Sequence, residues 1–132
     1  MQDIQLSKKA LRSQMAGMRN RLTTSQVSHA SGVISRKLKE LTPLMEAQSI
    51  MAYAAFGNEV DIADFIDEQV QAGKTILLPR VESQGRLSAV RFAGWEATLM
   101  SSYGIREPQG NPYPPEKIEA VIVPGLAFDP RG

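Results

Sequence analysis

Two short apolar runs flank an amphipathic stretch near the middle of the chain, and this arrangement constrains the fold more than any other feature. The runs, at residues 49–54 and 75–79, have the length of buried strands. The stretch between them predicts a helix that Asp61 caps and that Gly73 ends in the left-handed conformation. A unit of about thirty residues is the size of a right-handed βαβ crossover. Because proline donates no ladder hydrogen bond, we expect the second strand to end at Pro79.

The first forty residues predict two amphipathic helices. One stripe at helical spacing consists of Leu11, Met15, Met18 and Leu22. A capping box at Thr23 and Gln26 then predicts the start of a second helix, whose apolar stripe runs from Val27 to Leu41 and which Pro43 closes. The other face of the first helix carries the cations Lys8, Lys9, Arg12, Arg19 and Arg21.

The second half of the chain is less regular. Residues 87–92 alternate like a strand after a turn at Gln84 and Gly85, and residues 101–115, rich in glycine and proline, predict a loop. Residues 120–124 form another apolar run, and the sequence stops eight residues after Pro124. Because a buried parallel strand normally leads into a covering helix, we expect that helix to come from elsewhere or the chain to be a fragment.

These elements together predict a single domain over residues 1–132. Its fold class is α/β, with three α/β/α layers around a mostly parallel, Rossmann-like sheet whose C-terminal part is missing. A chain of 132 residues can bury one core, and its net charge of +1 favours neither nucleic acid nor an acidic substrate. The lack of cysteine excludes disulfides, a thiolate zinc site and a cysteine nucleophile. Without a spanning apolar run or a signal peptide, we expect a cytoplasmic protein that does not bind membranes.

Several charged residues are candidates for a binding site, each with a simpler explanation. Lys8 and Arg12, four residues apart on one helix face, could clamp a phosphate or could form a solvated face. Glu59 follows the first strand, where open α/β sheets bind ligands, but it could also be a turn carboxylate in water. Asp129 could orient a base, bind a metal through water or cap a turn, and Tyr103 could stack on a flat ligand or pack on the sheet. No P-loop, dinucleotide motif, nucleophile elbow or zinc-protease motif is present.

Taken together, five elements in order resemble one enzyme family. They are the K-x-x-L-R element formed by Lys8, Lys9, Ala10, Leu11 and Arg12, the Ala52-Tyr-Ala54 strand followed by Asn58-Glu-Val60, the Ala72-Gly-Lys74 and Leu78-Pro-Arg-Val81 strand, the Tyr103-Gly-Ile-Arg-Glu-Pro108 loop, and the Val121-Ile-Val-Pro-Gly-Leu-Ala-Phe-Asp129 strand and loop. This set resembles the 5-formyltetrahydrofolate cyclo-ligase family from about residue 8 to Gly132. Two departures are Tyr103, where many members have tryptophan, and the end of the sequence at Gly132, where the family continues into a Gly-rich ATP-binding stretch.

The resemblance implies an ATP-dependent ligase. Such enzymes convert 5-formyltetrahydrofolate to 5,10-methenyltetrahydrofolate with release of ADP and phosphate, and they use magnesium. It implies that Lys8, Lys9, Ala10, Leu11 and Arg12 contact ATP and that Ala54, Glu59 and, less directly, Tyr103 contact the folate. It assigns no catalytic residue, no magnesium ligand and no role to Asp129, and it leaves the oligomeric state open.

Two other functions stay open at this point. A non-catalytic fragment of the family could retain only a folate- and nucleotide-binding surface. A nucleic-acid binder could use the cations of the first helix, although the near-zero net charge and the lack of interleaved aromatic residues disfavour it.

Overall fold

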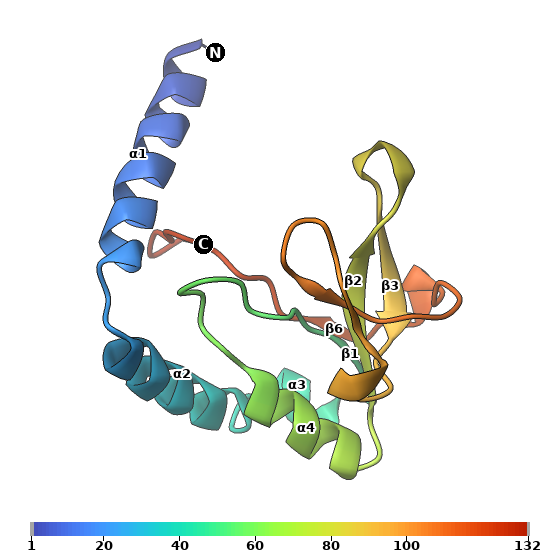
Figure 1. The fold of residues 1–132 in the computed structure, drawn as a ribbon. Helices are drawn as coiled ribbons and strands as arrows, with labels where there is room; N and C mark the ends of the chain where they lie inside the picture. The colour runs from blue at the N-terminus through green and yellow to red at the C-terminus, as the bar shows by residue number, and fades with distance from the viewer. Residues whose placement is uncertain (1, 132) are drawn as a thin grey trace.

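A computed structural model describes residues 2–131 of the chain, and the side chains from residue 4 onward. The main elements in chain order are α1 (Gln2–Asn20), α2 (Thr24–Leu38), α3 (Thr42–Glu46), β1 (Ser49–Met51), α4 (Ala63–Gln71), β2 (Thr75–Val81), β3 (Leu87–Arg91), β4 (Leu99–Met100), β5 (Arg106–Glu107) and β6 (Ala120–Val121). In Figure 1, α2, α3 and α4 gather beside the sheet, whereas α1 projects away from it.

The main sheet is mixed but mostly parallel, with strand order β3-β2-β1-β6. Strand β1 is parallel to both of its neighbours, with Ile50 opposite Ile76 on one side and Ala120 on the other. Strand β3 is antiparallel to β2, and β4 and β5 form a separate antiparallel pair. The predicted α/β class, the mostly parallel sheet and the strand–helix–strand unit are therefore confirmed.

The core lies between the sheet and the helices. Ile50, Ile76 and Leu78 are buried with Phe65 and Ile66 of α4 in one apolar cluster. Helix α4 packs on β2, and α2 packs on α4. Each of these large side chains stabilises the fold by about 1.5–3 kcal/mol through burial. This cluster holds the ends of the strands in place, and the site described below depends on them.

In the described part of the chain, the face of the main sheet opposite the helices is covered by a hairpin instead of a helix. Leu77, which alternates with the core residues of β2, is also fully buried. The hairpin of β4 and β5 lies beside β2 and β3 (Figure 1), and the Val81 amide donates to Glu107 Oε2 at 2.8 Å. The expectation of a loop over residues 101–115 is wrong at β5, which is only two residues long and too short to show a period.

The ends of the helices confirm one expectation and correct another. The capping box is present: the Gln26 amide donates to Thr23 Oγ1 at 3.1 Å and the Thr23 amide to Gln26 Oε1 at 2.9 Å. Helix α2 ends at Leu38, however, and Pro43 lies in the first turn of α3 instead of closing α2. Proline is accepted there because an amide hydrogen in the first helical turn has no partner within the helix.

Strand β2 passes through Pro79 and ends at Val81, so the expected end at Pro79 is wrong. The Ala52 amide donates to the Leu77 carbonyl, which shows that odd-numbered residues of β2 turn their backbone groups toward β1. The last residue of β1 pairs with Leu77. The nitrogen of Pro79 therefore faces the β1 side of the strand, beyond the point where β1 ends. Its lack of an amide hydrogen costs no ladder hydrogen bond there.

The apolar stripe of α1 is largely exposed. Leu11, Met18 and Leu22 keep 45%, 53% and 42% of their surfaces accessible. Helix α1 itself is confirmed, but none of the other described elements packs extensively against it (Figure 1). Helical spacing in the sequence identifies the apolar stripe. It does not show whether another surface of the protein covers that stripe and buries it. No helix in the described part of the chain is long and apolar enough to cross a bilayer.

Candidate functional site

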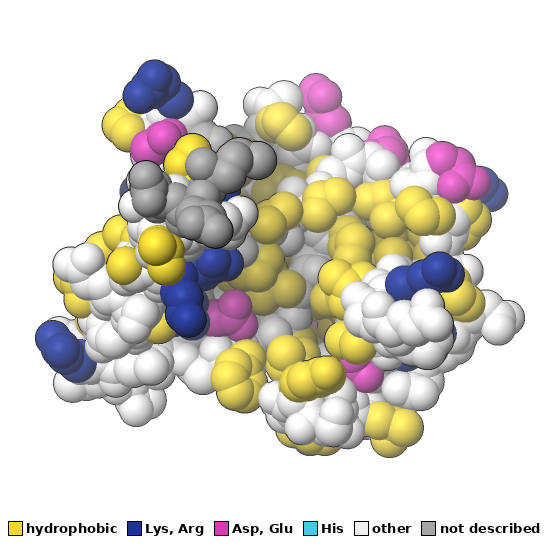
Figure 2. Space-filling model, turned by 90° about the horizontal axis from the view of Figure 1, so that it is seen from above, with side chains coloured by type: hydrophobic (Ala, Val, Ile, Leu, Met, Phe, Trp, Pro, Cys, Tyr) yellow, Lys and Arg dark blue, Asp and Glu magenta, His cyan; other side chains and the backbone are white. Residues whose placement is uncertain are grey.

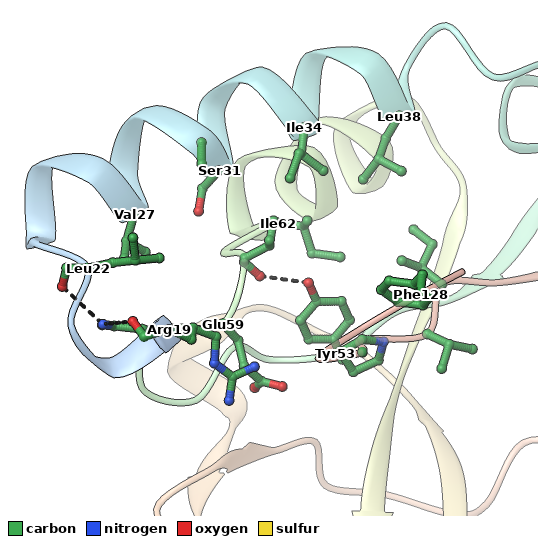
Figure 3. A pocket seen from close by; sticks show the side chains of 17 residues that line it. Arg19, Leu22, Val27, Ser31, Ile34, Leu38, Tyr53, Glu59, Ile62 and Phe128 are labelled. Atoms are coloured by element: carbon green, nitrogen blue, oxygen red, sulfur yellow. Dashed lines mark hydrogen bonds between the residues drawn. The ribbon is translucent and has the colours of Figure 1, made fainter. Parts of the chain in front are cut away.

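Two neighbouring cavities lie between α1, the turn after β1 and the segment after β6. The first, of about 420 Å³, is here named the cationic cavity; it is lined by Lys8, Leu11, Arg12, Arg19, Glu59 and residues 124–127. The second, of about 370 Å³, is named the apolar cavity (Figure 3). Its walls include Val27, Ile34, Leu38, Tyr53, Ile62, Ile122 and Phe128. Arg19, Glu59, Pro124 and Gly125 line both cavities.

Parallel strand pairing brings these segments together. Because β1 and β6 run in the same direction, the turn that follows β1 and the segment that follows β6 leave the same edge of the sheet. The first carries Glu59 and the second carries Gly125. Figure 2, which views the molecule from above in Figure 1, shows basic and acidic side chains next to a wide apolar surface.

The turn after β1 holds Glu59 in a defined orientation. The Phe56 amide donates to Glu59 Oε1 at 2.7 Å, and the Glu59 amide donates back to the Phe56 carbonyl at 3.2 Å. Gly57 has φ of 58°, in the left-handed region that glycine adopts without strain. One carboxylate oxygen thus fixes the turn, while the side chain also lines both cavities.

Tyr53 stabilises the same turn through a hydrogen bond. Its hydroxyl donates to the Val60 carbonyl at 2.7 Å, and its ring belongs to the core cluster. Burial raises the pKa of Tyr53 to about 12, and the negative charges of Glu59 and Asp61 add to this. The neutral phenol is therefore the form that the folded chain stabilises.

Asn58 ties α1 to the turn that carries Glu59. Its Nδ2 donates to the carbonyls of Arg19 at 2.9 Å and Leu22 at 3.2 Å. Carbonyls at the end of a helix have no partner within the helix, so this side chain supplies one. Since α1 has few other packing contacts, Asn58 sets where its cations lie relative to Glu59.

The structure brings together some of the predicted site residues but not others. Lys8, Leu11, Arg12 and Glu59 line the cationic cavity, whereas Lys9 and Ala10 do not. Ala54 packs against the core cluster and lines neither cavity. Tyr103 is 66% exposed and also lies outside both cavities.

The turn that carries Tyr103 nevertheless lies close to the site. A Cβ placed on Gly104 would come within 3.3 Å of the Phe56 ring, so this turn contacts the turn that bears Glu59. The predicted roles of these residues in binding ATP or folate stay predictions.

The segment after β6 is held by contacts within itself. Gly125 allows a close approach, but the group that approaches it is the ring of Phe128, which a Cβ at this position would strike. Asp129 Oδ1 accepts from the Arg131 amide at 2.9 Å, so here the carboxylate caps a turn. The predicted segment ends at Gly132, which lies outside the described residues.

Sequence reasoning missed Arg19, Asn58 and the apolar wall as parts of the site. A signal for Arg19 was present, because positions 8, 12 and 19 fall within about 40° on a helix. Asn58 and the α2 residues carried no such signal, since their roles depend on contacts between elements distant in sequence.

The described residues form no cage of protein ligands that could hold a magnesium ion without the help of phosphate oxygens or water. Over residues whose side chains the structure describes, no three histidine, cysteine, aspartate or glutamate residues gather closely enough to hold a metal. Glu59 is the carboxylate lining the cationic cavity. A site of this composition can neutralise an anion and accept hydrogen bonds from a neutral ring.

The fold and site define a class of α/β domain with a cation-lined cavity at the carboxyl edge of its parallel strands. A model of the 5-formyltetrahydrofolate cyclo-ligase family matches residues 4–132. The chain therefore belongs to the 5-formyltetrahydrofolate cyclo-ligase family, as its sequence motifs predicted.

Individual relatives agree with this assignment. The chain is 24% identical over 119 residues to 5-formyltetrahydrofolate cyclo-ligase of Escherichia coli (strain K12), covering 86% of this chain and 65% of the relative. It resembles the NMR structure of Aquifex aeolicus 5,10-methenyltetrahydrofolate synthetase with a TM-score of 0.81 and 28% identity, over 92% of this chain and 62% of that one. The 5,10-methenyltetrahydrofolate synthetase of Mycoplasma pneumoniae gives a TM-score of 0.71 and 26% identity, over 92% and 65%. The chain thus spans less than two thirds of each relative.

We expect Asn58→Ala to loosen the end of α1. Loss of both hydrogen bonds should lower the free energy of unfolding by about 1–3 kcal/mol and speed amide exchange in residues 15–22. Urea unfolding and hydrogen exchange measure the two effects. The exposed Asn111→Ala, in a distant loop, is the matched control. Unchanged exchange in α1 would show that Asn58 does not hold the helix.

We expect Tyr53→Phe to lower the free energy of unfolding by about 0.5–1.5 kcal/mol at neutral pH, because the hydrogen bond to Val60 is lost. Because the pKa of Tyr53 is raised, the free energy of unfolding of the parent depends on pH in a way that the Tyr53→Phe variant lacks. Its stabilising effect is complete below pH 10, the pKa of an unperturbed tyrosine, and is lost as the pH rises toward 12.

The stability gap between the parent and Tyr53→Phe should therefore shrink from pH 10 to 12. Urea unfolding across this range measures it, and Tyr103→Phe, at the exposed tyrosine, serves as control. A gap that does not change with pH would contradict the raised pKa.

Proposed function

We propose that the two cavities bind ATP and 5-formyltetrahydrofolate for the cyclisation that gives 5,10-methenyltetrahydrofolate, ADP and phosphate. The observation that carries the proposal is the placement of Lys8, Arg12 and Glu59 around one cavity, next to an apolar one. Family membership supports the same chemistry. The relatives' names, a cyclo-ligase and two methenyltetrahydrofolate synthetases, agree with it.

The cations of α1 suit the phosphates of the nucleotide. Arg12 offers planar hydrogen-bond donors and Lys8 offers a mobile point charge. Both side chains are exposed to water and neutralise the negative charge of the phosphates. Glu59 suits the folate, because its carboxylate accepts hydrogen bonds from ring N–H groups. The apolar cavity gives a flat ring a surface on which to pack.

In the proposed reaction, the formyl oxygen attacks the terminal phosphorus of ATP. A new O–P bond forms, the bond to the bridging oxygen breaks, and ADP leaves. N10 then attacks the formyl carbon, the carbon–oxygen bond breaks to release phosphate, and N10 loses its proton. The chain's contribution is to position the two substrates and to neutralise charge, which fits cavities whose described lining contains neither cysteine nor histidine.

We expect Arg12→Ala to weaken ATP binding by about 1–3 kcal/mol, because one charge-assisted contact is removed. Calorimetric titration of the chain with ATP measures the change. Arg21→Ala is the matched control, since Arg21 is exposed just beyond the end of α1 and lines neither cavity. Equal affinities of the parent and Arg12→Ala would remove Arg12 from the site.

Turnover is tested separately from binding. The absorbance of 5,10-methenyltetrahydrofolate, recorded with the chain, ATP and 5-formyltetrahydrofolate, reports the reaction. Product formation supports the proposed enzyme. Binding of both ligands without product supports the alternative of a non-catalytic folate- and nucleotide-binding domain. Failure to bind either ligand would overturn the proposal.

A further inference from the structure

Arg19 is the cation shared by the two cavities among the residues that line them. It lies in the last turn of α1, and its side chain is only partly exposed. Its Nε is buried and finds no hydrogen-bond partner in the part of the chain that the structure describes. Because buried polar groups in folded proteins are nearly always paired, this N–H points to an acceptor that a ligand supplies.

Glu59 would be the expected partner of Arg19 within the protein, but the two do not form an ion pair. Glu59 lines the same space, and Figure 3 shows both end groups turned toward it. Within the described residues, however, the ion pairs are Lys39 with Glu68 and Arg80 with Glu82. Glu59 instead accepts the Phe56 amide. Arg19 and Glu59 thus line the same two cavities without forming an ion pair with each other.

The helix geometry places Arg19 beyond the other two cations. Lys8, Arg12 and Arg19 fall within about 40° of one another around α1. At 1.5 Å per residue, Arg12 lies about 6 Å from Lys8 along the axis, and Arg19 lies roughly 10 Å further on. A polyphosphate held by Lys8 and Arg12 would therefore reach Arg19 only with its far end, where the apolar cavity begins.

We infer that Arg19 binds the terminal phosphate of a nucleoside triphosphate, at the boundary between the cationic and apolar cavities. This inference rests on the proposed function and assigns a third cation to it. Lys8 and Arg12 line the cationic cavity and not the apolar one, so they contact the inner phosphates. Arg19 neutralises the group that must face the second substrate.

The test compares the chain's affinity for ADP with its affinity for the non-hydrolysable β,γ-imido analogue of ATP. Arg19→Gln should weaken binding of the triphosphate by about 10- to 100-fold and leave ADP affinity unchanged. Arg12→Gln should weaken both nucleotides. Arg21→Gln, at an exposed residue that lines neither cavity, should change neither. Calorimetric titration gives the affinities, and circular dichroism during urea unfolding verifies that each variant folds.

The outcomes separate the two levels of the proposal. A parent chain that binds neither nucleotide overturns the proposed function and this inference with it. A parent that binds both, with Arg19→Gln losing nothing or losing both equally, overturns the role of Arg19 and leaves the proposed function standing. Arg19→Lys should recover part of the triphosphate preference, because charge is kept while the planar donors are lost. A purely structural role would not change the ratio of the two affinities.

Discussion

The parallel pairing of β1 with strands on both of its sides is the constraint on which the site depends. It forces the turn after β1 and the segment after β6 to leave the sheet at one edge. Glu59 and Gly125 meet there although more than sixty residues separate them. The apolar cluster of Ile50, Ile76 and Phe65 stabilises this pairing, so the packing of the core also positions the site.

The cationic side of the site is held less firmly than the acidic side. Glu59 sits in a turn closed by its own carboxylate and supported by Tyr53, a residue of the core cluster. The cations lie on α1, which projects from the molecule and whose end is tied down by Asn58. Elements with few buried contacts open most readily. We therefore expect α1 to open more readily than the turn of Glu59, to which Asn58 ties it.

Sequence patterns predicted much of the fold and part of the site. The strand–helix–strand unit and the Thr23 capping box were predictable because period, caps and turn residues act within a few neighbouring positions. Pro79 and β5 were not, because the first depends on which neighbour a strand has and the second on pairing of two-residue strands. Lys8, Arg12 and Glu59 were found from motifs. Helical spacing places Arg19 near Lys8 and Arg12, but its position between the two cavities and the contacts of Asn58 follow from the fold.

By itself, the sequence determined helices α1, α2 and α4, strands β1, β2, β3 and β6, the cationic face of α1 and membership of the family, because each is encoded in local spacing or in ordered motifs. Only the tertiary structure decided that this face shares a cavity with Glu59, that an apolar cavity adjoins it, and that the buried Nε of Arg19 lacks a partner. The physical reason is that a cavity is formed by segments far apart in the chain. Its lining follows from strand order and from the packing of α2 and α4, which no local pattern specifies.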